Sequence, residues 1–522
     1  MRQNLTIQAP GFLGINTEDS PLELEPGWAA VADNVIIDRY GRVGSRNGYT
    51  VKTGDASALG GEKIKHIHQG VPQVPSTSQI FSVGNNKIFK GDTTLTDITV
   101  GTPTGDDWHM DTLNDDTFFA QAGHDMLVYD HSADTMSTLA THTNYVANVY
   151  LPSLQPDIVH AAYGRLWAAS HTADTWTVSW SDLLNPVNFG TGSSGSIDVT
   201  ESWPHGHDEI TAIASHGNRI LVFGSHSILV YSSRAADGRL SDPANDLFLE
   251  DVIEGIGAIN KHSVWDIGTD LLFLDVSGLR SLGRTIQEKS LPIGDLSSNV
   301  RTTFRNQISL NTNPVTGVYD AKNGFLLVIM EDLPLLYCFD TTKFMEDGAA
   351  RVTHWTGMNI ACGAVLQDET IYFGNADGIV EYGGYIDDDK YFQMRYYTHV
   401  QDFGDPSLLK VPKKACFTVA GGNGQKAIAF WGFDFAYNFK RQNFFLNSGT
   451  PDYYNIDEFN ITTSDDPLDP TEYDGGGSTI GRYCIPLSSS GYNVILGFEA
   501  KIEGAAVSLQ EINLQTQIGR MR

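Results

Sequence analysis

Paired apolar runs return along the middle of the chain at a nearly regular interval. From about residue 79, a run of three to five apolar residues is followed by a tight polar turn and a second apolar run. The first runs begin near Gln79, Thr117, Arg165, Arg219, Asp270, Gly324 and Thr370, so successive starts lie 38, 48, 54, 51, 54 and 46 residues apart. Turn sequences such as Gly84-Asn85-Asn86 favour positive backbone angles, which indicates β-hairpins. A repeat of roughly 40 to 55 residues is typical of a β-propeller, in which each blade is a small antiparallel sheet.

The hairpins are apolar on both faces. In residues 220–223 and 228–231 every position is apolar, although successive residues of a strand point to opposite sides. A hairpin with one face in water would alternate apolar and polar residues. We therefore predict that each sheet packs between two others, as blades do in a propeller. Six blades are predicted, with five or seven as alternatives; a β-sandwich core with irregular strands is the other interpretation.

The segments on either side of the repeat differ from it. Residues 1–60 are rich in turns and predict an irregular N-terminal arm, whereas residues 61–385 form the predicted propeller. Within the propeller, Asp295–Gln307 has few strand formers and predicts a short helical insertion. Residues 386–522 lack the repeat, contain alternating strands and predict a C-terminal β-sandwich-like domain with a loose acidic loop at 464–478. The predicted fold class is all-β.

Charge restricts the function further. The chain has 34 basic and 63 acidic residues, a net charge of −29, which repels a nucleic-acid backbone and argues against tight DNA binding. The acidic stretch Asp387-Asp388-Asp389 is interpreted as a solvated turn. No apolar run approaches the roughly 20 residues of a membrane span, and the first residues lack a secretion signal, so we expect a soluble protein without a membrane span.

Histidines and acidic residues suggest three metal sites, each with a simpler explanation. His205 and His207 could form a metal-binding pair, but no third ligand accompanies them at helical spacing, so a loop pair is favoured. His66 and His68 flank Ile67 and are interpreted as exposed strand residues. An acidic group in the loop could surround calcium, but its spacing does not fit an EF-hand, and a solvated loop is favoured. This group consists of Asp465, Asp466, Asp469, Glu472 and Asp474.

Candidate residues for glycan chemistry are equally open to structural explanations. Asp182 and Asp340 end apolar strands, where a glycosidase could place paired carboxylates, but aspartate is also common at the start of a turn. Trp176 and Trp180 could form a glycan-binding surface, yet their even spacing on a strand favours core packing. No nucleophile-elbow, phosphate-loop, zinc-protease or dinucleotide motif occurs. The sequence therefore predicts no catalytic, cofactor-binding or metal-binding residue, and no enzyme.

The four cysteines stand far apart in the sequence, at Cys338, Cys362, Cys416 and Cys484, with no CxxC pair. A disulfide framework or a zinc site would need closer or paired spacing, so neither is expected. Cys338 and Cys362 lie in apolar surroundings and are predicted to be buried, inert thiols. This cysteine usage fits synthesis in a reducing compartment.

Residues 163–232 contain a characteristic order of short motifs. These are Tyr163-Gly164-Arg165-Leu166-Trp167, then Ser179-Trp180-Ser181-Asp182, and later Val222-Phe223-Gly224-Ser225 and Ile228-Leu229-Val230-Tyr231. In this order they resemble the tail nozzle proteins of short-tailed, P22-like bacteriophages. Residues 326–357 and 497–512 follow the family's order of later blade and closing strands.

The resemblance implies a structural virion protein of the tail, made in the host cytoplasm. It implies a ring, in that family a hexamer, beneath the portal and adaptor proteins, which extends the DNA channel and receives a needle, spike or fibre. Such a ring serves DNA retention and ejection, and DNA would pass without specific binding. The alternative function is a propeller that binds or cleaves glycans of the host surface.

Overall fold

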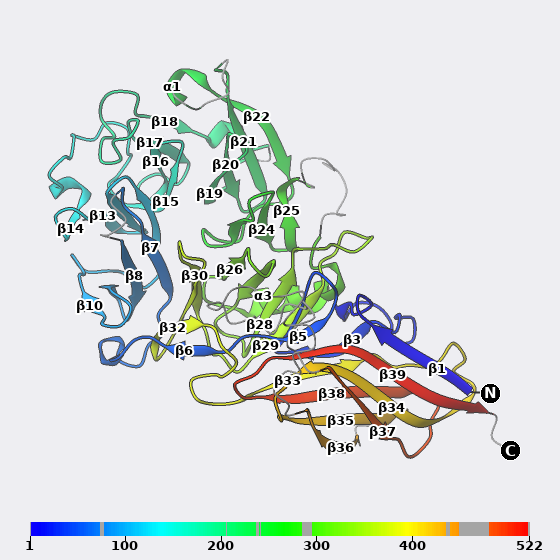
Figure 1. Cartoon of the computed structure of the whole chain (residues 1–522). Helices are drawn as coiled ribbons and strands as arrows, with labels where there is room; N and C mark the ends of the chain where they lie inside the picture. The colour runs from blue at the N-terminus through cyan, green and yellow to red at the C-terminus, as the bar shows by residue number, and fades with distance from the viewer. Residues whose placement is uncertain are drawn as a thin grey trace, which may run out of the picture.

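The predicted hairpins form the middle strands of small antiparallel sheets arranged as a propeller (Figure 1). The computed structural model describes residues 2–73, 78–204, 206–235, 240, 242–283, 285, 295–434, 439–447 and 480–519. Seven sheets, here called blades 1 to 7, follow one another along the described chain. The predicted propeller is confirmed, whereas the predicted number of six blades is not.

Blades 1 to 4 have four strands each. Blade 1 contains β7 (His66–Gly70), β8 (Gln79–Gly84), β9 (Lys87–Lys90) and β10 (Thr96–Asp97); blade 2 contains β11 (His109–Leu113), β12 (Asp116–Gln121), β13 (His124–Asp130) and β14 (Thr135–Thr138). Blade 3 contains β15 (Pro156–Ala162), β16 (Arg165–His171), β17 (Thr177–Trp180) and β18 (Gly195–Asp198); blade 4 contains β19 (Ile210–His216), β20 (Arg219–Gly224), β21 (Ser227–Ser233) and β22 (Leu247–Glu254).

Blades 5 to 7 complete the circle. Blade 5 contains β23 (Val264–Asp266), β24 (Leu271–Asp275) and β25 (Gly278–Ser281); blade 6 contains β26 (Thr316–Asp320), β27 (Phe325–Ile329), β28 (Leu335–Asp340) and β29 (Val352–Thr356). Blade 7 contains β30 (Cys362–Val365), β31 (Ile371–Asn375), β32 (Gly378–Tyr382) and, from the start of the chain, β6 (Tyr49–Val51). The first strands of consecutive blades contact each other around the whole ring, and β30 contacts β7. The chain thus closes the ring with a strand from its N-terminal segment.

Alternate residues of one strand are buried against different neighbours. In β20, Ile220 and Val222 belong to a core shared with Trp167 of blade 3. Leu221 and Phe223 belong to a second core on the other face, where Phe223 lies 5.4 Å, centroid to centroid, from Phe273 of blade 5. Both faces of the hairpin are therefore dry, as the unbroken apolar runs predict.

The second part of the molecule is a β-sandwich, drawn at the lower right of Figure 1. One sheet has the order β37-β34-β39-β5-β4, with β1 also paired to β39. The other continues from blade 6 in the order β29-β3-β33-β38-β35-β36, and β2 pairs with β3. The strands from the end of the chain are β33 (Phe392–Thr398), β34 (Leu409–Gly421), β35 (Lys426–Phe433), β36 (Lys440–Phe445), β37 (Ile480–Pro486), β38 (Val494–Ile502) and β39 (Val507–Gly519).

The predicted arm, residues 1–60, contributes strands to both parts of the molecule. β1 (Arg2–Gln8), β2 (Gly14–Ile15), β3 (Trp28–Asp33), β4 (Val35–Ile37) and β5 (Val43–Ser45) lie in the sandwich. β3 lies between β29 and β33, and it joins β29 through the parallel pair His354–Asp33. One contiguous apolar core includes Leu272 of blade 5, Phe339 of blade 6 and Phe498 of the sandwich. Propeller and sandwich are therefore packed together as one unit.

A buried ion pair lies where the chain crosses between the two parts. Arg46, which follows β5, forms two hydrogen bonds with the carboxylate of Asp387, at 2.9 and 2.7 Å, and its side chain is completely buried. Its Nε–H donates to Asn34 Oδ1 at 2.9 Å, and its guanidinium lies 4.0 Å from the ring centroid of Phe392. The interpretation of residues 387–389 as a solvated turn is therefore wrong for Asp387, because the turn aims this carboxylate at a buried arginine.

Helices are few and short among the described residues. The predicted insertion is confirmed, because residues 298–310 form the 3₁₀ helix η6 (Ser298–Val300) and then α3 (Arg301–Leu310). Phe304 anchors α3 by packing against Tyr337 and Phe339 of blade 6. Other short helices in the described part of the chain are η1 (Ser57–Leu59), η3 (Leu139–Thr141), η4 (Thr200–Ser202) and α1 (Pro243–Asp246).

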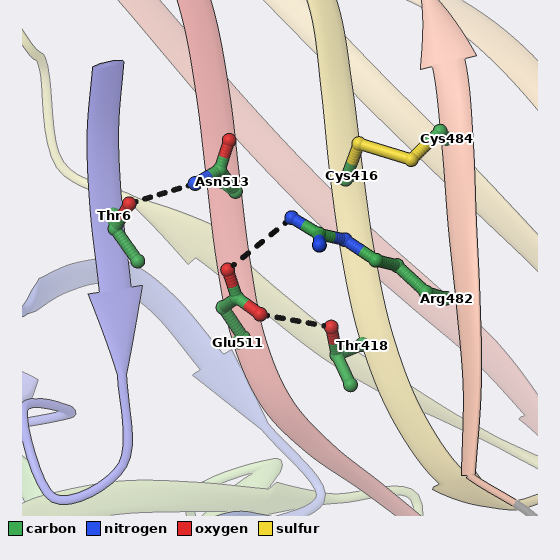
Figure 2. Close-up of a disulfide and its surroundings, with 7 residues drawn as sticks. All are labelled: Thr6, Cys416, Thr418, Arg482, Cys484, Glu511 and Asn513. Atoms are coloured by element: carbon green, nitrogen blue, oxygen red, sulfur yellow. Dashed lines mark hydrogen bonds and ion pairs between the residues drawn. A yellow bond between two sulfur atoms is a disulfide. The ribbon is translucent and has the colours of Figure 1, made fainter.

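A disulfide joins two neighbouring strands of the sandwich, contrary to the expectation from cysteine spacing. Cys416 of β34 and Cys484 of β37 lie directly opposite each other in the strand register, with Cα atoms 4.0 Å apart (Figure 2). Next to it, Glu511 accepts a hydrogen bond from Thr418 and pairs with Arg482 across three strands. The two cysteines are 68 positions apart in the sequence, and no local pattern indicates that they are neighbours. Cys338 and Cys362 are free and buried, as predicted.

Candidate functional site

Histidines gather on the first strands of the blades, which surround the propeller axis. His66 and His68 lie on β7, His109 on β11 and His160 on β15. Their partners lie on the neighbouring first strands: His68 Nε2 is 2.8 Å from Thr112 Oγ1 of β11, and His160 Nδ1 is 3.4 Å from Asp111 Oδ2 of the same strand. Polar side chains therefore bridge one blade to the next near the axis.

Four side chains near the axis form what we call the axial cluster: His66, Asp107, Lys261 and His262. Asp107 Oδ1 lies 2.8 Å from His262 Nε2 and 3.5 Å from His66 Nε2, and the two imidazole rings stack at 4.1 Å between centroids. Lys261 Nζ lies 3.3 Å from Asp107 Oδ2 and 2.6 Å from Asp157 Oδ1. His66 lies in blade 1, Asp107 precedes blade 2, and Lys261 and His262 precede blade 5, so the cluster connects distant parts of the ring.

The pKa values of Asp107, His262 and the nearby His109 are all lowered, which determines which of these groups are charged at neutral pH. Burial raises the pKa of Asp107, but hydrogen bonds from His262 and His66 outweigh burial, so the pKa is far below its usual value. Burial, followed by repulsion from His66, lowers the pKa of His262 well below its usual value. Burial and the charge of Lys261 lower the pKa of His109 to about 3. At neutral pH, His109 and His262 are therefore neutral, and Asp107 carries a negative charge beside the Lys261 ammonium.

The axial cluster is better explained as a structural ion pair than as a metal site. His66 Nε2, Asp107 Oδ1 and His262 Nε2 lie within 4.8 Å of one another, as three metal ligands would. The ammonium of Lys261, however, lies 3.3 Å from Asp107, and only 3% of the Lys261 side chain is exposed. A divalent cation would have to bind next to this buried positive charge. We conclude that the axial cluster mainly ties blades together.

The interpretation of His66 and His68 as exposed strand residues is wrong. His66 is 7% exposed, and His68 is half-buried in a hydrogen-bonded chain with Thr112, Thr117 and His131. Alternation along His66-Ile67-His68 does separate two faces, but the polar face points to the ring's interior, where facing blades supply the partners. Asp107 and Lys261 could not be identified as those partners from the sequence because they lie 41 and 195 residues from His66.

The other predicted metal ligands do not assemble in the described part of the chain. His207 is exposed, with its ring 5.6 Å from that of Trp176, and it belongs to neither of the two described groups that could hold a metal. His205 and the acidic loop 464–478, including Asp465, Asp466, Asp469, Glu472 and Asp474, lie outside the described residues.

The strand-end aspartates are turn residues, as the favoured interpretation holds. Asp182 accepts hydrogen bonds from the backbone N–H groups of Leu183 and Ser193, both at 2.9 Å. Asp340 accepts from the backbone N–H of Thr342 at 2.8 Å and from its hydroxyl at 2.6 Å. Burial raises the pKa of Asp340. Each carboxylate stabilises its own turn.

Of the two candidate tryptophans, Trp180 is a core residue. It is 2% exposed, its ring lies 5.4 Å from that of Trp167, and its indole N–H donates to the carbonyl of Ser193 at 3.1 Å. Trp176 is half-buried. Core packing is therefore confirmed for Trp180, which removes half of the predicted glycan-binding pair.

Comparisons with known proteins identify general structural likeness and no family. No family model matches the chain, and no curated protein matches it. Solved structures that resemble it include a computationally designed protein, Ika8 (TM-score 0.34, 10% identity, 71% of this chain and 98% of that one), and a streptogramin B lyase (TM-score 0.36, 11% identity, 61% and 93%). PorZ of the Porphyromonas gingivalis type-IX secretion system also matches (TM-score 0.34, 14% identity, 67% and 44%). At these TM-scores we draw no functional argument from the likenesses. No described helix is long and apolar enough to cross a membrane.

Proposed function

We propose that this chain is a structural virion protein, the tail nozzle subunit of a short-tailed bacteriophage. Several copies form a ring that extends the DNA channel below the portal and adaptor proteins and carries the distal tail parts. The sequence resemblance over residues 163–232 is the origin of this proposal. Sixfold symmetry and the named neighbours are part of it.

The observation that carries the proposal is that propeller and sandwich share one β-sheet and one apolar core. β3 pairs on one side with β29 of blade 6 and on the other with β33 of the sandwich, and a single apolar core runs through both parts. The buried Arg46–Asp387 pair reinforces the crossing point. A subunit in the wall of a pressurised channel needs such stiffness, because interfaces on different parts must keep a fixed separation as the ring closes.

The charge of the chain suits contact with moving DNA. A net charge of −29 provides few cations for phosphate groups, and each Lys or Arg on a phosphate would add affinity and hence friction.

A recess on the sandwich, lined by residues such as Tyr391, Lys426 and Glu499, has a volume of about 150 Å³. That is below the roughly 300–1,000 Å³ typical of small-molecule sites.

The test is to image the purified full-length chain and the phage tails that contain or lack it. We expect closed rings with a central opening, and DNA-filled heads that leak or lack the distal tail when the gene is disrupted. The proposal would be contradicted if the purified chain stayed monomeric and the phage tails were complete without it. Binding or cleavage of host-surface glycans by that monomer would support the alternative function.

A further inference from the structure

Two aspartates of blade 2 face each other directly across a strand pair. Asp116 begins β12 and Asp130 ends β13, and the two are paired residues in the antiparallel register. Like charges in this position repel each other. His142, which follows η3, directs Nε2 toward both carboxylates, at 3.6 Å from Asp116 Oδ1 and 4.0 Å from Asp130 Oδ2. The three ligand atoms lie within 4.8 Å of one another.

This group lacks a positive partner in the described part of the chain. The ion-pair contacts of Asp116 and Asp130 there involve His142 and no Lys or Arg. The side chain of His142 is 3% exposed, and its Nε2 has no hydrogen-bond partner among the described atoms. Burial raises the pKa of Asp116 to about 6, against the effect of His142, and the charges of Asp130 and Asp115 raise it further. A bound cation would remove both the repulsion and the unsatisfied nitrogen.

We propose that Asp116, Asp130 and His142 bind a divalent transition-metal ion of the Zn²⁺ type. Zinc lies about 2.0–2.2 Å from nitrogen and carboxylate ligands, so two ligands of one ion are at most about 4.4 Å apart. The two separations from His142 Nε2, 3.6 and 4.0 Å, satisfy this limit, and the two carboxylate oxygens lie within 4.8 Å of each other. One imidazole and two carboxylates suit Zn²⁺ or Mn²⁺ better than Ca²⁺, which takes oxygen ligands.

Neighbouring backbone groups hold the Asp130 carboxylate in place, whereas metal binding would break one hydrogen bond of His142. Asp130 Oδ1 accepts hydrogen bonds from the backbone N–H groups of Ser132 and Ala133, at 2.8 and 2.9 Å, which leaves Oδ2 for the ion. His142 Nδ1 accepts a hydrogen bond from the Asn144 N–H at 3.3 Å. When Nε2 binds the metal, the ring proton resides on Nδ1, and this long contact opens. The ion ties the ends of β12 and β13 to the segment after β14.

The experiment uses the full-length chain, freed of metal by a chelator and of any affinity tag, and titrated with Zn²⁺ at pH 7 by calorimetry. We expect one Zn²⁺ per chain at this site, with binding at least tenfold weaker in Asp116→Asn and in His142→Gln. His66→Gln is the matched control, because it alters the other histidine–aspartate group and should bind Zn²⁺ like the unchanged protein.

A thermal melt separates metal binding from a purely structural role. Without metal, Asp116→Asn should melt at or above the temperature of the unchanged protein, because the substitution removes a like-charge contact. Zn²⁺ should raise the melting temperature of the unchanged protein and of His66→Gln, but not of Asp116→Asn. The proposal is overturned if the unchanged protein binds no Zn²⁺ saturably. It is equally overturned if Asp116→Asn and His142→Gln keep full affinity, or if only His66→Gln loses it.

Discussion

The charge of Arg46 is balanced by Asp387, because the arginine side chain is completely buried and the two groups form an ion pair at 2.7 Å. Replacing it by Met leaves the Asp387 carboxylate buried and unpaired, which should lower the free energy of unfolding by about 3–5 kcal/mol. Urea denaturation measures this loss. The control is Lys52→Met, which breaks the Lys52–Glu381 pair at 2.6 Å, where the side chains are 36% and 38% exposed. Such a pair contributes less than about 1 kcal/mol, so equal losses in the two variants would contradict the assignment.

His171 should make the protein less stable in acid. It is fully buried, its Nδ1–H donates to the Ser153 carbonyl at 3.2 Å, and its Nε2 has no partner among the described atoms. Burial lowers its pKa to about 4, against 6.5 when exposed. The unfolded chain therefore takes up a proton that the folded chain does not, so stability is present above pH 6.5 and falls as the pH drops toward 4.

The variant His171→Asn tests this pH dependence, because it keeps a donor near the position of Nδ1 but does not titrate. Between pH 7 and pH 4.5, the unchanged protein should lose on the order of 2 kcal/mol more than the variant. Denaturant midpoints measured at each pH give the comparison. Parallel losses in the two proteins would show that His171 is not responsible.

Individual strands were predictable where their partners are close in the sequence. Residues 220–223 and 228–231 are consecutive strands of one hairpin, so their apolar runs and the turn between them were sufficient. β6 has only three residues and pairs with β32, more than 300 residues later, and no local pattern indicates such a partner. The same sequence distance applies to the axial cluster, because no pattern near His66 indicates Asp107 or Lys261 as its neighbours.

The disulfide between β34 and β37 leads to a prediction about the number of reactive thiols. Cys338 and Cys362 are 3% and 1% exposed, and burial raises the pKa of both, so neither forms a reactive thiolate in the folded protein. With Cys416 and Cys484 joined, a thiol reagent should detect about zero groups in the native chain, two after unfolding and four after unfolding with reduction. Four groups after unfolding without reductant would show that the two strands are not linked.

At the scale of the whole molecule, the N-terminal strands have unequal importance. β1 is an edge strand on β39, whereas β3 lies inside the ten-stranded sheet that joins propeller and sandwich. A chain lacking residues 2–8 should fold with reduced stability. A chain lacking residues 2–37 should lose its fixed tertiary structure, because β29 and β33 lose their shared partner. Near-ultraviolet circular dichroism and limited proteolysis distinguish these outcomes, and a native-like spectrum for the longer deletion would contradict the role of β3.

The division into a propeller and a sandwich could be predicted because the hairpin repeat stops near residue 385. The sequence does not predict that both ends of the chain build the sandwich. Residues 1–45 contain only short strands separated by turns, and the burial of these strands depends on sheets formed by residues 392–519. Residues such as Ile7 and Val35 are apolar but isolated, and only the core that they enter explains them.

The position of β3 also sets the order of events during synthesis. Residues 28–33 leave the ribosome early, but their partners at 352–356 and 392–398 emerge more than 300 residues later. At about 5–20 residues per second, this delay is roughly 20–70 s. β3 therefore waits without its partners β29 and β33 while the blades form behind it, and the final tertiary structure is completed only after nearly the whole chain has been translated.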